Sequence, residues 1–334
     1  MSADMKVCIY GAGAIGGFIG ARLAARGGCT VSAVARGATL AALRGHGWRL
    51  RQGDELITAP CQASEAPADL GVQDLVVIAV KGPALTAVAG QLAPLIGPHT
   101  LVLPAMNGVP WWFGAHAPAI GSAPLESVDP GGRIAAAIPL ALVLGCVVHA
   151  SCFTPEPGLV QHKMGQGLIV GDPAGGTSDR AQALGEVLRG AGFDTTVSAD
   201  VRRDIWYKLW GNLTMNPISA LTGATVDRIL DDPLLRAYCS SAMLEASAVG
   251  ARIGCAIEQS PEDRHAITRT LGAFRTSMQQ DVDAGRPIEL DAIVGVVVEI
   301  ARRVGVATPG IDALMGLTRL FARVKGLYPV SSDT

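Results

Sequence analysis

The chain contains 334 residues, a length that favours two domains or three small ones. Hydrophobic residues make up 49% of it and charged residues 17%, which excludes a disordered chain. The formal net charge is −2, so there is no basic surplus to neutralise phosphates, and we expect no nucleic-acid partner. The most apolar run, residues 134–148, covers 15 positions and contains a proline and a glycine, so we expect a buried core segment and no membrane span.

Composition also limits the metal chemistry and the compartment. The seven cysteines are scattered without a C-x-x-C pair, and the six histidines form no H-E-x-x-H motif, so we expect neither a disulfide framework nor a metal site. The N-terminal segment lacks a charged region followed by a long apolar core, which predicts no signal peptide. Together with the cysteine usage, this favours a cytoplasmic location.

In the N-terminal part, short apolar runs alternate with segments of helical spacing. The sequence predicts strands at residues 6–10, 30–35, 75–80 and 101–104, and helices at 14–26, 38–44 and 83–92. This alternation is typical of a parallel sheet that is covered by helices on both faces. The near-continuous valine, isoleucine and leucine of the strands indicates burial on both sides.

The pattern changes twice further along the chain. Residues 140–198 are expected to form strands and turns, whereas residues 200–325 show long helical patterns. The predicted helices cover residues 202–213, 232–253, 261–283 and 290–304. We therefore expect an α/β domain over residues 1–198 and an all-α domain over residues 199–330.

A glycine-rich turn joins the first predicted strand to the first predicted helix, with the sequence Gly11-Ala12-Gly13-Ala14-Ile15-Gly16. Gly11 permits the tight turn, Gly13 lets a pyrophosphate approach the backbone, and Gly16 lets helix and strand pack closely. The helix start offers N–H groups and the positive end of its dipole to the phosphates. We therefore predict that residues 1–198 form a Rossmann-type dinucleotide-binding domain. The alternative is a glycine turn in an α/β domain that binds no nucleotide.

The end of the second predicted strand bears on the choice of dinucleotide. It carries Arg36, where an enzyme specific for NAD would have an acidic residue for the ribose 2′-hydroxyl. A guanidinium can bind a 2′-phosphate, so we expect NADP(H); a solvated surface arginine is the alternative. Lys81 and Asn107 also follow predicted strands, whose carboxyl ends share the sheet edge at which ligands bind. Lys81 is equally compatible with simple capping of that edge.

Three polar residues in the helical half share one helix face. Lys208, Asn212 and Asn216 are spaced four residues apart, among tryptophans and leucines. Asparagine is disfavoured inside helices, so this face predicts a ligand with carboxylate or hydroxyl groups. The alternative is a pair of buried asparagines bonded to neighbouring backbone.

A second polar cluster in the helical half follows between residues 277 and 291. Ser277 and Asp281 lie one helical turn apart, and Arg286 is expected to pair with a nearby acid. Glu289 is expected at the start of a helix, where the helix dipole favours its negative charge. These residues are a second candidate part of a site.

Taken in this order, the glycine turn, Lys81, Asn107 and the two helical clusters resemble the ketopantoate reductase family over nearly the whole chain. The resemblance implies a Rossmann-type N-terminal domain, which binds NADP(H), and an all-α C-terminal domain of the 6-phosphogluconate-dehydrogenase-like kind, which binds substrate. The active site would lie in the cleft between them. It also implies that a small 2-keto acid, ketopantoate, is reduced by NADPH to pantoate on the route to pantothenate and coenzyme A.

The same resemblance carries roles onto single residues of this chain. Lys208 corresponds to the catalytic lysine, which acts as general acid, and Glu289 to a catalytic glutamate that also contacts the cofactor. Substrate binding falls on Lys81, Asn212, Asn216 and Ser277. Cofactor contacts fall on Gly11, Ala12, Gly13, Ala14, Ile15, Gly16, Arg36, Lys81, Asn107, Ala150 and Glu289.

The sequence departs from the biosynthetic members of this family at two places. Val226 stands where they tend to have another asparagine, and the loss of a carboxamide changes substrate recognition. Residues 107–132 form a longer segment with Trp111 and Trp112, whose rings could line a larger apolar pocket or belong to the core or an interface.

Two alternative functions therefore stay open. The departures favour a paralogous NADP(H)-dependent oxidoreductase that acts on another 2-keto or 2-hydroxy acid. The glycine turn and Arg36 alone would also permit an NADP(H)-binding regulator without turnover. A homodimer is the commonest oligomer of soluble proteins, but the sequence does not determine the oligomeric state.

Overall fold

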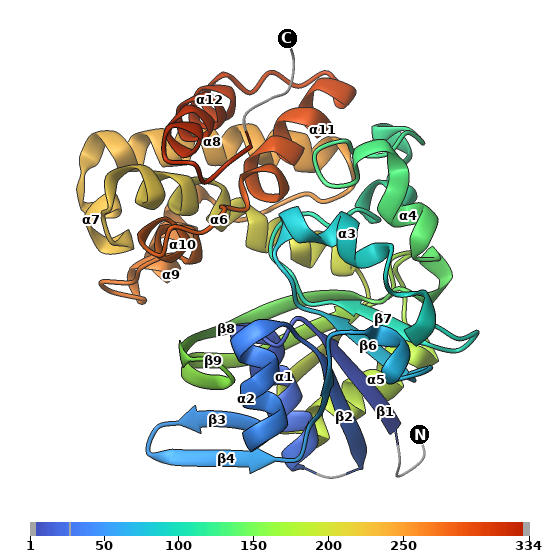
Figure 1. Ribbon diagram of the computed structural model, residues 1–334. Coiled ribbons are helices and arrows are strands. Elements are labelled where there is room, and N and C mark those ends of the chain that lie inside the picture. Colours follow the sequence, from blue (N-terminus) through green and yellow to red (C-terminus); the bar gives the residue numbers. More distant parts are fainter. Residues whose placement is uncertain (1–4, 27, 330–334) are drawn as a thin grey trace. The chain divides into compact units, whose positions relative to one another are not determined.

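The described residues, 5–26 and 28–329 of a computed structural model, contain a parallel sheet of five strands (Figure 1). The strand order is β5-β2-β1-β6-β7, with β1 Met5–Tyr10, β2 Cys29–Val34, β5 Gln62–Ser64, β6 Leu75–Ile78 and β7 Leu101–Pro104. In register, Ile9 of β1 pairs with Ala33 on one side and with Val77 on the other. The predicted parallel sheet is confirmed. Strands β1, β2, β6 and β7 lie at the predicted apolar runs because they are largely buried, whereas the short edge strand β5, Gln-Ala-Ser, carries no such run and is not predicted by the sequence pattern.

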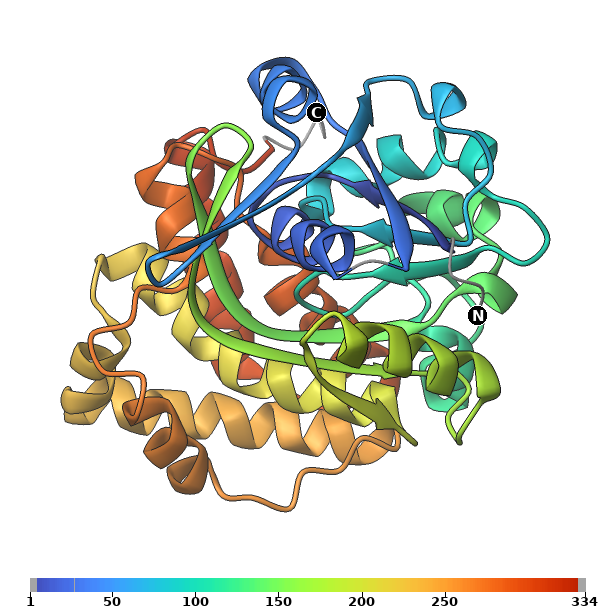
Figure 2. The same ribbon diagram turned by 90° about the horizontal axis from the view of Figure 1, so that it is seen from below.

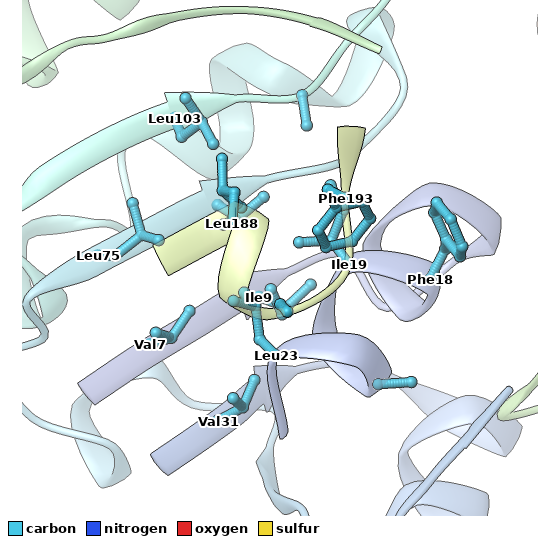
Figure 3. Packing of buried hydrophobic residues seen from close by; sticks show 14 of the residues in the cluster. Val7, Ile9, Phe18, Ile19, Leu23, Val31, Leu75, Leu103, Leu188 and Phe193 are labelled. Atoms are coloured by element: carbon cyan, nitrogen blue, oxygen red, sulfur yellow. The ribbon is translucent and has the colours of Figure 1, made fainter. Parts of the chain in front are cut away.

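Helices α1 (Ala14–Ala25) and α5 (Asp179–Gly190) contribute to one hydrophobic core with this sheet (Figure 3). Ile19 and Leu23 of α1, Ile9 of β1 and Leu188 of α5 are at most 1% exposed. Burial of such side chains is the main source of stability, and it fixes α1 against the end of β1. The other helices here are α2 Gly37–His46, α3 Leu85–Ala89 and α4 Arg133–Ala137, so the helix predicted over 83–92 is shorter than expected.

A second sheet lies in the same part of the chain, with the order β10-β9-β3-β4 and with β8 paired to β9. Its strands are β3 Trp48–Gln52, β4 Glu55–Ala59, β8 Gly145–Glu156, β9 Leu159–Gly171 and β10 Asp194–Ser198. β8 and β9 form a long curved hairpin, green in Figure 2. The prediction of strands and turns over 140–198 is wrong for α5. Ser178 caps that helix, but part of its buried face consists of small residues such as Ala181, which weakens the helical pattern.

Helices dominate the C-terminal part, as the sequence predicts. They are α6 Val201–Thr222, α7 Val226–Asp231, α8 Pro233–Arg252, α9 Pro261–Arg269, α10 Ser277–Asp283, α11 Val296–Val304 and α12 Pro309–Val324. The continuous helix predicted over 261–283 is wrong, because the chain breaks between α9 and α10, where Gly272 has a φ of +61°. The helix predicted over 290–304 begins as a π-helical turn, Asp291–Gly295. Within the described residues, no helix combines the length and apolarity that crossing a membrane requires.

Contacts divide the chain into two compact units. One comprises Met1–Met106 and Arg133–Asp204, and the other comprises Asn107–Gly132 and Ile205–Thr334. Residues 107–132 thus group with the helices, whereas the sequence pattern puts them inside 1–198. Long-range hydrogen bonds contribute to this grouping: the N–H groups of Glu126 and Ser127 donate to the Glu299 carboxylate of α11 at 2.9 and 2.8 Å.

Candidate active site

The glycine turn links β1 to α1, as predicted. Gly11 has a φ of +97°, and a Cβ added to Gly16 would stand 2.0 Å from the Gly11 carbonyl oxygen, so the fold itself requires both glycines. Gly13 differs, because a Cβ at this position would meet nothing of the described chain within 4 Å. Packing does not account for Gly13, whereas a phosphate that approaches the backbone would account for it.

The start of α1 supplies the other half of a phosphate site. Gly13 precedes the helix without a side-chain cap, and the first turn contains no acidic residue. The Gly17 N–H donates to the Gly13 carbonyl at 2.7 Å, so the N–H groups of Ala14, Ile15 and Gly16 have no acceptor inside the helix. With the positive end of the helix dipole, these groups suit an anion such as a pyrophosphate.

Arg36 stands two residues beyond β2, immediately before α2. Its side chain is 64% exposed, and its contacts are long, with Nη2 3.5 Å from Gln91 Oε1 and Nε 4.0 Å from Glu65 Oε1. Exposed contacts of this length contribute little energy, so the guanidinium is accessible to an anionic ligand. The hydroxyl of Tyr10, at the end of β1, donates to the same Gln91 oxygen at 2.7 Å. Burial raises the pKa of Tyr10, although Arg36 acts to lower it, so the hydroxyl keeps its proton.

Two further candidates of this unit belong to different parts of it. Lys81 is exposed and follows β6 by three residues, at the carboxyl edge of the parallel sheet that also bears Gly11. Ala150 lies in β8 of the second sheet, at the bulge where the pairing shifts between His149 and Ser151. Bulges are common beside active sites, but no local sequence signal predicted this one.

Lys208, Asn212 and Asn216 lie on the continuous helix α6, so their spacing does place them on one face. The ammonium of Lys208 donates to Asn107 Oδ1 at 2.8 Å, although the two residues are 101 positions apart. Asn212 is partly buried, and Asn216 is 5% exposed. The helical unit thus carries a cation, in contact with one carboxamide, on a helix face that bears two more.

The buried end of this α6 face is fastened to α10. The hydroxyl oxygens of Ser219 and Thr276 are 2.5 Å apart, and Ser219 also donates to the Asn216 carbonyl at 2.9 Å. Thr276 caps α10 by accepting from the Gln279 N–H at 3.2 Å. Ser277, the first residue of α10, is therefore held beside the end of the face that bears Asn216. The sequence contained a signal for this fastening, since Ser219 continues the polar face one turn beyond Asn216.

The second polar cluster is ordered by backbone and ion-pair contacts. Glu289 is 7% exposed and lies two residues before the π-helical turn, so its predicted place at a helix start is confirmed. The preceding N–H, of Ile288, donates to the Leu327 carbonyl at 3.1 Å. Arg286 pairs with the buried Asp281, with Nε 3.0 Å from Oδ1, as predicted.

The two departures from the family pattern lie in packed regions of the helical unit. Val226 is 2% exposed and belongs to an apolar cluster with side chains of α6, α7, α8 and α12. Trp111 and Trp112 are 5% and 3% exposed, and the Phe113 ring stacks on Trp206 with centroids 6.0 Å apart. We therefore interpret both tryptophans as core residues, which was the alternative to a pocket lining.

The candidate residues fall into both units. The first unit holds Gly11, Ala12, Gly13, Ala14, Ile15, Gly16, Arg36, Lys81 and Ala150. The helical unit holds Asn107, Lys208, Asn212, Asn216, Ser277 and Glu289. Asn107 and Glu289, which the resemblance assigns to the cofactor, thus belong to the unit that carries Lys208. Among residues 5–26 and 28–329, no group of histidine, cysteine and acidic side chains is arranged to hold a metal ion.

A parallel sheet with a glycine-rich turn after its first strand, together with a helical unit that carries a lysine–carboxamide pair, is typical of Rossmann-type oxidoreductases. Comparison with family models identifies the family. The model of ketopantoate reductase PanE/ApbA matches residues 7–175, and that of the ketopantoate reductase PanE/ApbA C terminal matches residues 200–322. The chain belongs to the ketopantoate reductase PanE/ApbA family, so the predicted family and fold class are confirmed.

Individual relatives agree with this assignment. The 2-dehydropantoate 2-reductase of Mesorhizobium japonicum is 43% identical over 326 residues, which cover 97% of this chain and 100% of the relative. A solved structure from Ralstonia solanacearum MolK2, named provisionally as a ketopantoate reductase, is 54% identical with a TM-score of 0.93, covering 97% and 99% of the two chains. A D-mandelate dehydrogenase solved with NADH and anilino(oxo)acetate shares the fold, with a TM-score of 0.82 at 20% identity and coverage of 97% and 100%.

Proposed function

We propose that the chain is an NADPH-dependent reductase that converts the 2-ketone of ketopantoate to the alcohol of pantoate. The observation that carries the proposal is the hydrogen bond between Lys208 and Asn107. Lys208 lies on the face of α6 that also bears Asn212 and Asn216. The 43% identity to a 2-dehydropantoate 2-reductase over nearly the full length of both chains supports this substrate.

Lys208 acts in this proposal as the general acid. Reduction of a ketone carbon leaves negative charge on oxygen, and an ammonium can stabilise that charge and donate the proton that neutralises it. The Asn107 amide oxygen accepts one N–H of Lys208 at 2.8 Å without taking the proton, so it orients the ammonium and leaves its charge intact. A general acid must be held within hydrogen-bonding reach of the reacting oxygen, and this contact supplies such an orientation.

The other groups of the helical unit suit the remaining polar atoms of a small keto acid. Asn212, Asn216 and Ser277 offer amide and hydroxyl donors for its carboxylate and hydroxyl groups, and we assign Lys81 of the first unit to the same task. Glu289 is an acceptor when ionised, so we assign it to hydroxyl groups of cofactor or substrate and count it with the catalytic residues.

The groups of the first unit likewise suit the phosphates of NADP(H). The space at Gly13 and the N–H groups at the start of α1 fit a pyrophosphate, and the exposed guanidinium of Arg36 fits a 2′-phosphate. When bound, the nicotinamide supplies the hydride. Ala150 and Asn107 complete the set of proposed cofactor contacts.

The experiment is NADPH oxidation, followed by absorbance, with ketopantoate and with a panel of bulkier 2-keto acids. The proposal is supported if the wild type turns over ketopantoate, Lys208→Ala has lost this activity and Lys163→Ala has kept it. Lys163 is the control because it lies in β9, in the other unit. Turnover that survives Lys208→Ala would refute the role of Lys208. Replacing NADPH by NADH tests the expected preference for NADP(H), and gel filtration determines the oligomeric state.

Val226 favours a second candidate function. Its apolar side chain is packed in a core cluster, so this position offers a substrate no carboxamide. A paralogous NADP(H)-dependent oxidoreductase that acts on another 2-keto or 2-hydroxy acid would turn over a member of the panel faster than ketopantoate.

A further inference from the structure

A π-helical turn stands directly after Glu289 and before α11. It covers Asp291–Gly295, and the helix continues from it as α11. π-helical turns are rare, they alter the regular hydrogen-bond ladder, and they occur often at functional sites. The function proposed above does not involve this turn, although two groups of contacts meet on it.

The first group of contacts joins the turn to Asn107. The N–H of Val109 donates to the Ala292 carbonyl at 2.9 Å. Gly108 has a φ of +83°, and a Cβ there would stand 2.3 Å from the Ala292 oxygen, so its backbone lies directly against the turn. Asn107 is the next residue back, and its Oδ1 accepts from Lys208. The position of this carboxamide thus depends on the position of one carbonyl of the π-helical turn.

The second group of contacts joins the turn to the C-terminal residues that follow α12. The hydroxyl of Tyr328 donates to Asp291 Oδ1 at 2.6 Å. The same oxygen lies 3.1 Å from where a Cβ of Gly295 would stand, so the carboxylate is folded over its own turn. The Leu327 carbonyl accepts from the Ile288 N–H at 3.1 Å. Residues 327 and 328 therefore hold the chain on both sides of Glu289.

We propose that Tyr328 and Asp291 are positioning residues of the active site. Their hydrogen bond fixes the π-helical turn, the turn fixes the backbone at Gly108 and Val109, and that backbone holds Asn107 on Lys208. Neither residue touches the reacting atoms. The proposal rests on the function proposed above, since it explains how the general acid of that reaction is oriented, and catalytic groups lose efficiency when displaced by fractions of an ångström.

Tyr328→Phe tests the relay, because it removes the hydroxyl and keeps the ring. The matched control is Tyr238→Phe, whose hydroxyl donates at the same 2.6 Å in the same unit to the carbonyl of Gly310, at the start of α12. We expect Tyr328→Phe to speed hydrogen exchange at the Val109 amide and to lower kcat about tenfold, the equivalent of one hydrogen bond, with a smaller change in KM for the keto acid. Tyr238→Phe is expected to leave both unchanged.

Substitutions of Asp291 provide a second test of the proposal. Asp291→Asn keeps an oxygen that can accept from Tyr328 and should retain slow exchange and most of kcat, whereas Asp291→Ala should resemble Tyr328→Phe. Unchanged exchange at Val109 in Tyr328→Phe, or equal effects of Tyr328→Phe and Tyr238→Phe, would overturn the proposal. The exchange measurement needs no turnover. A wild-type protein that reduces no 2-keto acid would therefore refute the proposed function, while the exchange at Val109 still decides whether the relay exists.

Discussion

Gly13 and Gly16 are a matched pair of substitution sites, since both belong to the turn before α1 and only one is packed against protein. An alanine at Gly16 would place Cβ 2.0 Å from the Gly11 carbonyl oxygen, where real Cβ contacts essentially never fall below 3.0 Å. The backbone would have to move by about 1 Å, and overpacking of this kind costs about 1–3 kcal/mol. We expect Gly16→Ala to lose about 3 kcal/mol of stability, at the top of this range, because the contact is to backbone.

Gly13→Ala should behave in the opposite way. Gly13 has φ −80° and ψ −156°, an extended backbone that alanine also adopts, and nothing of the described chain surrounds it. Reduced entropy of the unfolded chain favours alanine by about 0.4–1 kcal/mol, and the poorer cap that alanine provides offsets most of this gain. We expect stability within about 0.5 kcal/mol of wild type and, because the added methyl fills the proposed phosphate space, an NADPH Kd raised about 10–100-fold.

The two quantities are measured separately, stability by urea unfolding and Kd by titration of NADPH fluorescence under conditions in which each variant is folded. A Gly13→Ala protein that binds NADPH as tightly as wild type would show that this turn does not hold the pyrophosphate. A Gly16→Ala protein as stable as Gly13→Ala would refute the close packing of α1 on β1.

Three further predictions concern single side chains. Arg36→Ala should raise the KM for NADPH about 10–100-fold and leave that for NADH unchanged, measured by initial rates with each cofactor, because only NADPH carries the 2′-phosphate. Val226→Asn should lower the unfolding free energy by about 1–3 kcal/mol in urea titrations, because it buries a carboxamide in an apolar cluster; an unchanged midpoint would mean that the site is polar. Burial acts to raise the pKa of Glu299, but the hydroxyl and N–H of Ser127, the N–H of Glu126 and the guanidinium of Arg303 outweigh it, so the pKa lies below its ordinary value of 4.5. The ionised Glu299 therefore stabilises the fold above pH 4.5, and this stability is lost as the pH falls through the lowered pKa. Glu299→Gln should lower the urea midpoint near neutral pH by more than it does below pH 4.5.

Local patterns in the sequence determined much of the first unit. Four of the five parallel strands could be predicted from runs of apolar residues, because a buried strand leaves a continuous signal, whereas the edge strand Gln62–Ser64 leaves none. The glycine turn could be predicted because its residues are adjacent, and tight turns and close packing restrict single positions to glycine. The face of Lys208, Asn212 and Asn216 followed from helix geometry alone, since one continuous helix carries all three.

Tertiary structure decided the rest. The contact of Asn107 with Lys208 joins positions 101 apart, and the hydrogen bonds of Glu299 that help to draw residues 107–132 into the helical unit join positions more than 170 apart. The π-helical turn at Asp291 carries no signal of its own in a helical pattern. Periodicity reports only which face of an element is buried, whereas the partner on that face is selected by packing and hydrogen bonding of the whole chain, so a site assembled from distant segments appears only when the chain is folded.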